Sequence, residues 1–154
     1  MIDVVSAEVR SRMMAGIRGK NTKPEITVRR YLHSLGYRYR LHKKDLPGRP
    51  DLVLAKHKVV IFVHGCFWHC HQGCFYSRIP KTRQAFWSDK LGKNVVRDEH
   101  QIKQLCALGW RVIVVWECGV KHCFDSAFCL SEMISSSHEQ VESWPLYPPR
   151  KGQV

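Results

Sequence analysis

Four stretches of the chain carry the apolar patterns of β-strands. Residues 37–42 alternate apolar and polar side chains, which is typical of a strand with one solvated face. Residues 51–55 and 58–64 are two apolar runs separated by a short turn, and they predict a pair of neighbouring strands. Residues 110–117 form a continuous apolar run, as expected for a strand that is buried on both faces.

Helical spacing of apolar residues predicts helices before, between and after these strands along the chain. Residues 6–22 predict a short arm helix followed by a loop. Residues 23–37 predict a helix with Pro24 in its first turn and Gly36 at its end. Residues 94–110 predict a further helix, whose inner face consists of Val95, Ile102, Leu105 and Leu108. A last helix is expected after the final predicted strand.

The order of these elements predicts an α/β fold with a central mixed sheet flanked by helices. A length of 154 residues fits one domain, covering residues 1–154. Within it we expect residues 1–20 to form an N-terminal arm. The Pro-rich, basic residues 140–154 are expected to form a loosely ordered tail.

The charge of the chain is the first indication of its partner. Lys and Arg number 25 against 13 Asp and Glu, which gives a formal net charge of +12. Such an excess in a small chain favours a polyanionic partner, most often nucleic acid, over a basic protein without one. The sequence shows no signal-peptide-like apolar segment at its start and no apolar run of membrane-spanning length. We therefore expect a cytoplasmic protein without a membrane partner.

The segment 62–74 is unusually rich in metal-binding residue types, with three histidines and three cysteines. Thiolate and imidazole groups at this density predict a structural zinc site rather than a set of buried free cysteines. The odd total of seven cysteines in a reducing compartment argues against a disulfide framework. Cys118, after the last predicted strand, is the candidate distant ligand. The choice among the nearer ligands stays open between Cys66, His69, Cys70, His71 and Cys74.

Acidic and imidazole groups near strand ends are the candidate catalytic residues. Asp51 begins one predicted strand and faces the end of the next, where it is placed to hold Mg²⁺ against a phosphate, although Asp after Pro also suits a turn. Glu25, in the first turn of a helix, also suits a role as a helix-dipole acid. His64 and His69 fit a general base beside a phosphate as well as a structural or zinc-binding histidine.

Aromatic side chains are interleaved with cations in the middle of the chain. Phe67, Trp68, Phe86 and Trp87 accompany the basic stretch 78–98. This pattern suits base stacking or intercalation beside phosphate contacts, and core packing is the alternative. We expect at least one member of each aromatic pair to lie in the core. The basic cluster consists of Arg78, Lys81, Arg83, Lys90, Lys93 and Arg97.

Together these motifs resemble the very short patch repair (Vsr) mismatch endonucleases. The matching residues begin with Met14, Ile17, Asn21, Thr22 and Glu25, followed by LPGRPD at 46–51, VIFVHGCFWH at 60–69, P-x-T-x-x-x-FW-x-x-K-x-x-x-N-x-x-RD at 80–98 and GWRVIVVWEC at 109–118. The resemblance implies a restriction-endonuclease-like fold. This sequence departs from the common motif of the restriction-endonuclease-like superfamily, because Phe62 and His64 occupy the positions where an acid and a lysine are usual.

The resemblance also implies an activity and a site. The activity is a nick in one strand, 5′ of the thymine of a T:G mismatch that arises from deaminated 5-methylcytosine. Asp51 would bind Mg²⁺, with the backbone carbonyl of Val63 completing a second magnesium site. His69 would activate the attacking water, oriented by Asp98, and the remaining catalytic residues would be Glu25 and His64.

Two further groups of residues take their roles from the resemblance. Phe67, Trp68 and Trp87 would wedge into the base stack from the major groove, and Met14 from the minor groove. The implied zinc ligands are Cys66, His71, Cys74 and Cys118. This loop is one residue longer than the family pattern and carries an additional thiol, so Cys70 competes with His71 as a ligand.

The implied partners follow from this activity. We expect double-stranded DNA with a T:G mismatch, mismatch-repair proteins as further partners, a monomer, and a bacterial cytoplasmic location on the nucleoid. One rival interpretation is a non-catalytic, zinc-stabilised DNA-binding module. A second is an endonuclease of the same fold that acts on a different DNA structure or on undamaged sites.

Overall fold

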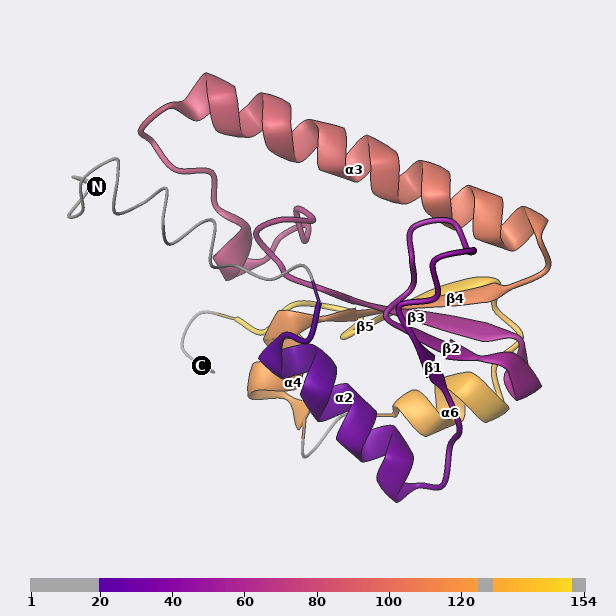
Figure 1. The fold of residues 1–154 in the computed structure, drawn as a ribbon. Helices are drawn as coiled ribbons and strands as arrows, with labels where there is room; N and C mark the ends of the chain where they lie inside the picture. Colours follow the sequence, from indigo (N-terminus) through magenta and orange to yellow (C-terminus); the bar gives the residue numbers. More distant parts are fainter. Residues whose placement is uncertain (1–19, 125–128, 151–154) are drawn as a thin grey trace.

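A five-stranded mixed sheet forms the centre of the molecule (Figure 1). The computed structural model describes residues 20–124 and 129–150. The strands lie in the order β1 (Arg40–Leu41), β2 (Leu52–Leu54), β3 (Val59–His64), β4 (Arg111–Trp116) and β5 (Val141–Trp144). The first three are joined by antiparallel pairing and the last three by parallel pairing, which confirms the expected mixed sheet.

The central strands β3 and β4 pair along their whole length, from Val59 with Arg111 to His64 with Trp116. Both strands are buried over most of their residues, because helices cover both faces of the sheet. The short 3-10 helix η1 (Ala55–His57) forms the predicted turn between β2 and β3. The parallel connection from β3 to β4 includes a long loop and helix α3 (Gln84–Ala107), which confirms the α/β class.

Helices form a layer on each side of the sheet. α3 lies along one face, whereas α2 (Lys23–Ser34), α4 (Glu117–His122) and α6 (Leu130–Ser135) lie along the other (Figure 1). The core on the α2 side includes Val28, Leu32, Ile61, Val115 and Ile134, and the core on the α3 side includes Val53, Val60, Phe62, Leu105 and Val112. The strands β2, β3 and β4 thus contribute alternate residues to each core.

The boundaries of α2 follow from local chemistry, of which the roles of Pro24 and Gly36 were predicted from the sequence. The side chain of Thr22 accepts a hydrogen bond from the backbone N–H of Glu25, and Pro24 lies in the first turn. At the other end Gly36 has a φ of 86°, a conformation that glycine adopts without strain. The amide of Gly36 donates to His33 O and that of Tyr37 to Leu32 O, which satisfies carbonyls of the last turn.

Helix α3 differs from the prediction at both ends. It begins at Gln84, ten residues or nearly three turns before the expected start, and Trp87 and Leu91 extend its buried face over this added part. The prediction that Leu108 lies inward is wrong. Leu108 is 57% exposed because the helix ends at Ala107 and Leu108 forms its C-cap.

The expectation of a loosely ordered tail at residues 140–154 is wrong for its first part. Val141–Trp144 pairs with β4 as the edge strand β5, and Trp144 is 5% exposed in the α2-side core. Trp144 packs this strand into the core. The polar and Pro-rich composition around it had indicated a tail without such packing. The expected arm helix, with Met14 and Ile17, lies outside the described residues. No helix in the described ranges has both the length and the apolar character needed to cross a membrane.

We predict that Trp144→Ala lowers the free energy of unfolding by about 3–5 kcal/mol, since it empties a buried aromatic site and detaches β5. Urea unfolding followed by circular dichroism measures this change. Leu146→Ala is the control, because Leu146 is 77% exposed and its loss should cost less than about 0.5 kcal/mol. Equal stability of both variants would show that β5 does not hold the sheet together.

Candidate active site and metal-binding loop

A cleft of ≈620 Å³ opens where β2 begins and β3 ends. Antiparallel pairing of Leu52 with Ile61 brings Asp51 beside the last residues of β3. Helix α3 supplies the opposite wall with Arg97, Asp98 and Gln101. The residues with charged or imidazole side chains that line the cleft are Lys20, His42, Lys44, Arg49, Asp51, His64, His69, Arg97 and Asp98.

Asp51 is held in the cleft by the backbone of β3. The amide of Val63 donates to Asp51 Oδ2 at 2.8 Å. Burial, together with the neighbouring Glu25 carboxyl, raises the pKa of Asp51 to about 8. Neighbouring carboxylates such as those of Asp51 and Glu25 disfavour each other's charged form. A bound cation would relieve that repulsion. The pair is therefore a place where a divalent cation is electrostatically favoured.

Glu25 is buried behind Asp51, with only 1% of its surface exposed. Its Oε2 accepts from the backbone N–H of Asn21 at 2.9 Å and from the Arg29 guanidinium, and its Oε1 lies 2.8 Å from His42 Nε2. Burial alone would raise the pKa of Glu25, but hydrogen bonds with Asp51 and His42 and the charge of Arg29 lower it overall. The carboxylate form is thus favoured at this buried position.

Among the contacts that histidine side chains of the cleft make with carboxylates, the one between His69 and Asp98 is the shortest. His69 Nδ1 donates to Asp98 Oδ2 at 2.5 Å, since a carboxylate can only accept. This contact fixes the tautomer that leaves His69 Nε2 without a proton when the ring is neutral. The His64 ring stacks on the His69 ring at 3.8 Å between centroids and 6° between planes. Burial holds the pKa of His64 well below its usual range, and the neighbouring His69 and Arg97 side chains lower it further.

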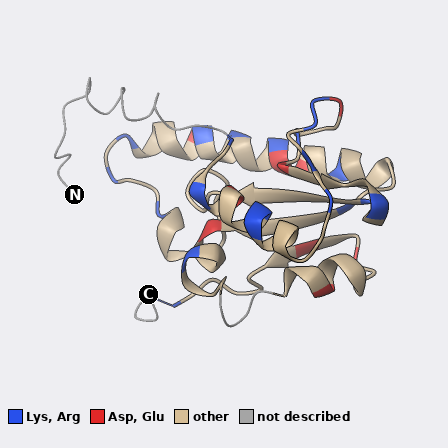
Figure 2. Cartoon of the chain, turned by 60° about the horizontal axis from the view of Figure 1, so that its bottom comes forward, with Lys and Arg blue, Asp and Glu red and all other residues tan. Residues whose placement is uncertain are grey.

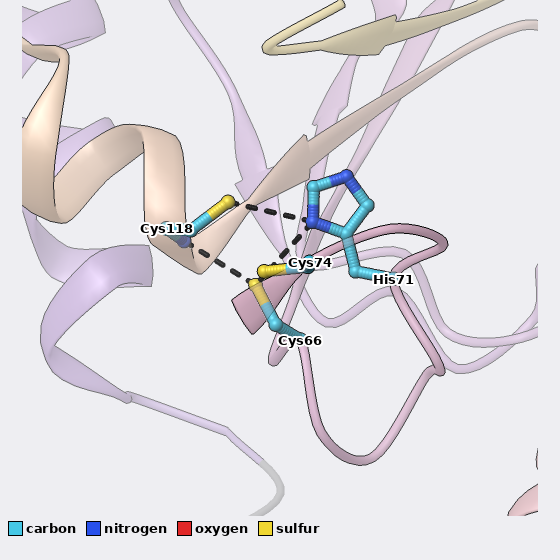
Figure 3. A group of neighbouring side chains, drawn as sticks. All are labelled: Cys66, His71, Cys74 and Cys118. Atoms are coloured by element: carbon cyan, nitrogen blue, oxygen red, sulfur yellow. Dashed lines mark hydrogen bonds between the residues drawn. The ribbon is translucent and has the colours of Figure 1, made fainter. Parts of the chain in front are cut away.

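Three thiols and one imidazole converge beside the cleft (Figure 3). Cys66, His71 and Cys74 come from the loop after β3, and Cys118 comes from the first turn of α4. All four are buried, and their potential ligand atoms lie within 4.8 Å of one another. His71 Nδ1 lies 3.6 Å from Cys66 Sγ and 3.4 Å from Cys118 Sγ. Three thiolates and one imidazole are a donor set typical of a closed structural zinc site.

Neighbouring groups orient these four side chains. The His71 ring stacks on the Trp116 ring, with centroids 4.1 Å apart and planes 5° apart. The backbone N–H of Cys118 donates to Cys66 Sγ at 3.4 Å, and the amide of His71 donates to Cys66 O at 2.9 Å. The thiol of Cys118 and the His71 imidazole lower the pKa of Cys66 despite its burial. One thiolate is therefore favoured in the group, as metal ligation requires.

Cys70 lies outside this group. Its Sγ approaches Leu91 O on α3 at 3.8 Å, and burial and Asp98 raise its pKa. The backbone of Cys70 is left-handed, with φ 52°, and Cys70 is not among the residues whose potential ligand atoms lie within 4.8 Å of one another. The structure therefore favours His71 over Cys70 as the fourth member of the cluster.

An aromatic cluster lies on the loop and at the start of α3. Trp87 packs against Phe67 and Trp68 with centroid distances of 5.5 and 6.0 Å. Trp87 is 8% exposed and Phe86 42%, which confirms the expectation of one core residue for this pair. The same expectation is wrong for Phe67 and Trp68, because both are only partly buried. Part of the Phe67 and Trp68 rings therefore stays accessible to a partner, and buried Trp87 packs against both rings.

Cations surround the cleft and the aromatic cluster. Figure 2 shows Lys and Arg on the turn before α3, along α3 and on loops near the sheet. Lys90 Nζ lies within 6 Å of three rings, at 5.6 Å from Trp68 and 5.8 Å from both Phe86 and Trp87. An ammonium over aromatic rings suits both cation–π stabilisation and contact with a phosphate.

Comparisons with known proteins decide the family. A family model described as DNA mismatch endonuclease Vsr matches residues 2–75. The DNA mismatch endonuclease Vsr of Escherichia coli is 44% identical over 121 residues, which cover 79% of this chain and 77% of that protein. The chain belongs to the Vsr family. It is therefore a DNA-nicking endonuclease by family.

Other Vsr-like relatives are named as nicking enzymes. The type II nicking enzyme V.XorIIP of Xanthomonas oryzae pv. oryzae is 52% identical over 118 residues, or 77% of this chain and 86% of that protein. The type II nicking enzyme V.NmeAIP of Neisseria meningitidis is 45% identical over 122 residues, or 79% of this chain and 86% of that protein. The family assignment thus rests on matches over most of each chain.

The residues predicted for the Vsr site fall into three neighbouring groups. The cleft contains Asp51, Val63, His64, His69 and Asp98, and Glu25 lies directly behind it. The cluster contains Cys66, His71, Cys74 and Cys118, and the aromatic group contains Phe67, Trp68 and Trp87. Met14 lies outside the described residues.

Sequence reasoning missed His42 and Arg29, which contact Glu25. Their sequence patterns did not indicate a role in the site, because Arg29 lies on the polar side of a predicted helix and His42 ends a predicted alternating strand. One signal for His42 was available in the sequence. It is a polar residue at the end of the predicted strand that precedes the strand of Asp51.

We predict that His71→Ala lowers the free energy of unfolding by about 3 kcal/mol or more, because it removes a buried ring stacked on Trp116 and the partner of two thiols. Cys70→Ala should cost less than about 1 kcal/mol, since this side chain is only partly buried and makes one weak contact. Urea titrations of the two variants make the comparison. A Cys70→Ala variant as unstable as His71→Ala would reverse the ligand assignment.

Proposed function

We propose that this Vsr-family endonuclease nicks one DNA strand 5′ of the thymine in a T:G mismatch that arises from deaminated 5-methylcytosine. The observation that carries the proposal is the convergence of Asp51 and the His69–Asp98 pair on one basic cleft beside a partly exposed aromatic cluster. The mixed sheet with a carboxylate at the start of β2 supports the restriction-endonuclease-like architecture that the motif Pro50-Asp51 implies.

The acidic end of the cleft fits magnesium. Mg²⁺ prefers one or two carboxylates together with water and substrate oxygens, and Asp51 offers a carboxylate with one oxygen fixed by Val63. Asp51 and the backbone carbonyl of Val63 are the groups that would hold the ion. When bound, Mg²⁺ polarises the phosphate and stabilises the charge that develops during hydrolysis.

Side chains of the chain itself account for the proton transfer. His69 Nε2 accepts a proton from the attacking water, whose oxygen forms a bond to phosphorus as the bond to the leaving oxygen breaks. Asp98 holds the ring and stabilises its protonated form, as a carboxylate does for a catalytic imidazole. Neutral His64 packs against His69 and limits the ring's rotation. Lys20, Lys44, Arg49 and Arg97 attract the phosphate backbone.

The aromatic cluster supplies a physical basis for mismatch selectivity. Phe67 and Trp68 would enter the base stack from the major groove with Trp87 behind them, and Met14 would enter from the minor groove. Separating a base step costs a few kcal/mol and least at a mismatched pair. A weakly stacked T:G pair is therefore the position that the wedge opens most easily.

The proposed structural metal is zinc, held by Cys66, His71, Cys74 and Cys118. Support comes from the soft donor set, the burial of all four side chains and the Trp116 stack on His71. When bound, zinc would tie the loop that carries His69 to the end of β4. DNA is the proposed partner, acted on by a monomer in the bacterial cytoplasm, where mismatch-repair proteins are further candidate partners.

The two rival functions make different predictions. A non-catalytic DNA-binding module gives no role to the short His69–Asp98 contact beside Asp51. An endonuclease for undamaged sites needs no wedge, yet Phe67 and Trp68 are only partly buried although both are large aromatic side chains. Both observations favour the mismatch endonuclease.

Nicking of matched duplexes tests this proposal. We expect magnesium-dependent nicking of a T:G duplex at least ~10²-fold faster than nicking of the same duplex with C:G, because the stacked pair resists the wedge. Asp51→Ala should lower the nicking rate by about 10²-fold or more. Strand-specific gel electrophoresis under single-turnover conditions measures each rate.

Two results would count against the proposal. Equal rates on T:G and C:G duplexes would remove the mismatch specificity. An Asp51→Ala variant as active as the unaltered protein would remove the magnesium role of Asp51. Asp45→Ala is the matched control, since Asp45 is an exposed acid that pairs only loosely with Lys43 at 3.6 Å.

We also predict one bound zinc ion per chain, whose removal by a chelator lowers the midpoint of thermal unfolding by roughly 10 °C or more. The reason is that a closed site contributes its binding free energy to folding. Elemental analysis and calorimetry measure the two quantities. Cys118→Ser should lose the metal and exposed Cys129→Ser should retain it. Protein purified without any bound metal would refute the prediction.

A further inference from the structure

His42 occupies a position between the two carboxylates behind the cleft. Its Nε2 lies 2.8 Å from Glu25 Oε1 and 3.8 Å from Asp51 Oδ1, and its side chain is 21% exposed. Its ring also lines the cleft. The three residues Glu25, His42 and Asp51 therefore form one group whose polar atoms lie within 4.8 Å of one another.

The sheet register places His42 there. β1 pairs Leu41 with Leu52, so the next residue along β1 lies beside Asp51. The amide of His42 donates to Asp51 O at 3.2 Å, which extends the antiparallel ladder by one step. The backbone of His42 then adopts a left-handed conformation with φ 46°, which is unusual for a residue other than glycine. Such a conformation persists where surrounding contacts fix it, and these contacts are often functional.

The tautomer of His42 follows from its two neighbours. Arg29 Nη2 lies 3.4 Å from His42 Nε2, and Glu25 Oε1 lies 2.8 Å from the same nitrogen. One nitrogen cannot donate and accept at once. The shorter contact is to a carboxylate, which only accepts, and Arg29 already donates to Glu25 Oε2 and Asn21 Oδ1. Nε2 therefore carries the hydrogen and donates to Glu25.

We propose that His42 is a positioning residue of the active site: its Nε2–H, together with Arg29, holds the buried Glu25 carboxylate in place behind Asp51. This inference rests on the proposed nuclease function for its kinetic consequence, but the contact itself does not. Arg29 holds one oxygen of Glu25 and His42 the other, so both oxygens are occupied by donors. Such outer hydrogen bonds orient the carboxylates of a cation site and commonly affect activity by 10- to 100-fold.

A rival interpretation of the same group is a cation site with His42 as a ligand. The hydrogen bonds argue against it, because Glu25 Oε2 already has two donors and Oε1 has the imidazole. A cation bound to all three side chains would have to displace His42 from Glu25. The positioning role requires no such change.

Variants of His42 test the kinetic consequence. His42→Leu should lower the single-turnover nicking rate on a T:G duplex by about 10- to 100-fold at saturating Mg²⁺. The dissociation constant for DNA should change little, and the midpoint of thermal unfolding, which the loss of a donor to buried Glu25 lowers, should stay above the assay temperature. His42→Gln should restore most of the rate, because the amide nitrogen of Gln reaches a similar position and donates to Glu25. His33→Leu is the control, since His33 is an exposed histidine near the far end of α2 and should leave the rate unchanged.

Nitrogen-15 NMR of the imidazole groups tests the contact without any activity. We expect His42 Nε2 in its protonated, N–H form, with a signal that changes in Glu25→Ala. A bare Nε2, or a His42→Leu variant that nicks at the unaltered rate, would overturn the inference. A protein that fails to nick any T:G duplex would instead refute the proposed function, and the NMR result would still decide the role of His42.

Discussion

The convergence of Cys66, His71, Cys74 and Cys118 is the interaction on which the rest of the site depends. The loop between β3 and α3 is long and contributes few side chains to the two main cores, so those cores cannot fix its shape. The cluster joins this loop to the first turn of α4, and Asn94 Nδ2 donates to Trp68 O at 3.0 Å from the other side. Residues between Cys66 and His71 are therefore held on a short, constrained path. They include Phe67, Trp68 and His69, to which we assign two different tasks: contact with the base stack for Phe67 and Trp68, and proton transfer for His69.

The remaining parts of the site come from rigid elements. The register between β2 and β3 places Asp51, and the register between β1 and β2 places His42. Asp98 is carried by α3, the longest helix among the described residues. Groups from a sheet, a helix and a braced loop thus meet at one cleft, and each is fixed by packing or hydrogen bonds outside it. Such preorganisation is what a hydrolytic site needs, because its dipoles must already point at the charge that develops.

The sequence predicted the parts of this arrangement that depend on residue type and periodicity. Apolar runs identified β3 and β4, and the density of thiols and imidazoles pointed to the Cys/His cluster, in which the structure then separated His71 from Cys70. It could not predict His42, whose role depends on strand register and a left-handed backbone. It also missed β5, because a short edge strand with one buried residue, Trp144, has no alternating pattern to reveal it. The buried role of Trp87 was visible only in part, since its neighbours Phe86 and Arg83 indicated an exposed, DNA-binding surface.

The most direct test of this account is the nicking rate as zinc is withdrawn. A chelator that leaves Mg²⁺ in excess would be titrated into the protein, and bound zinc and single-turnover nicking of a T:G duplex would be measured on the same samples. If the metal cluster positions His69 and the aromatic wedge, nicking should fall in step with bound zinc and should return when zinc, but not more Mg²⁺, is added. A zinc-free protein that nicks the T:G duplex at the original rate would contradict the account.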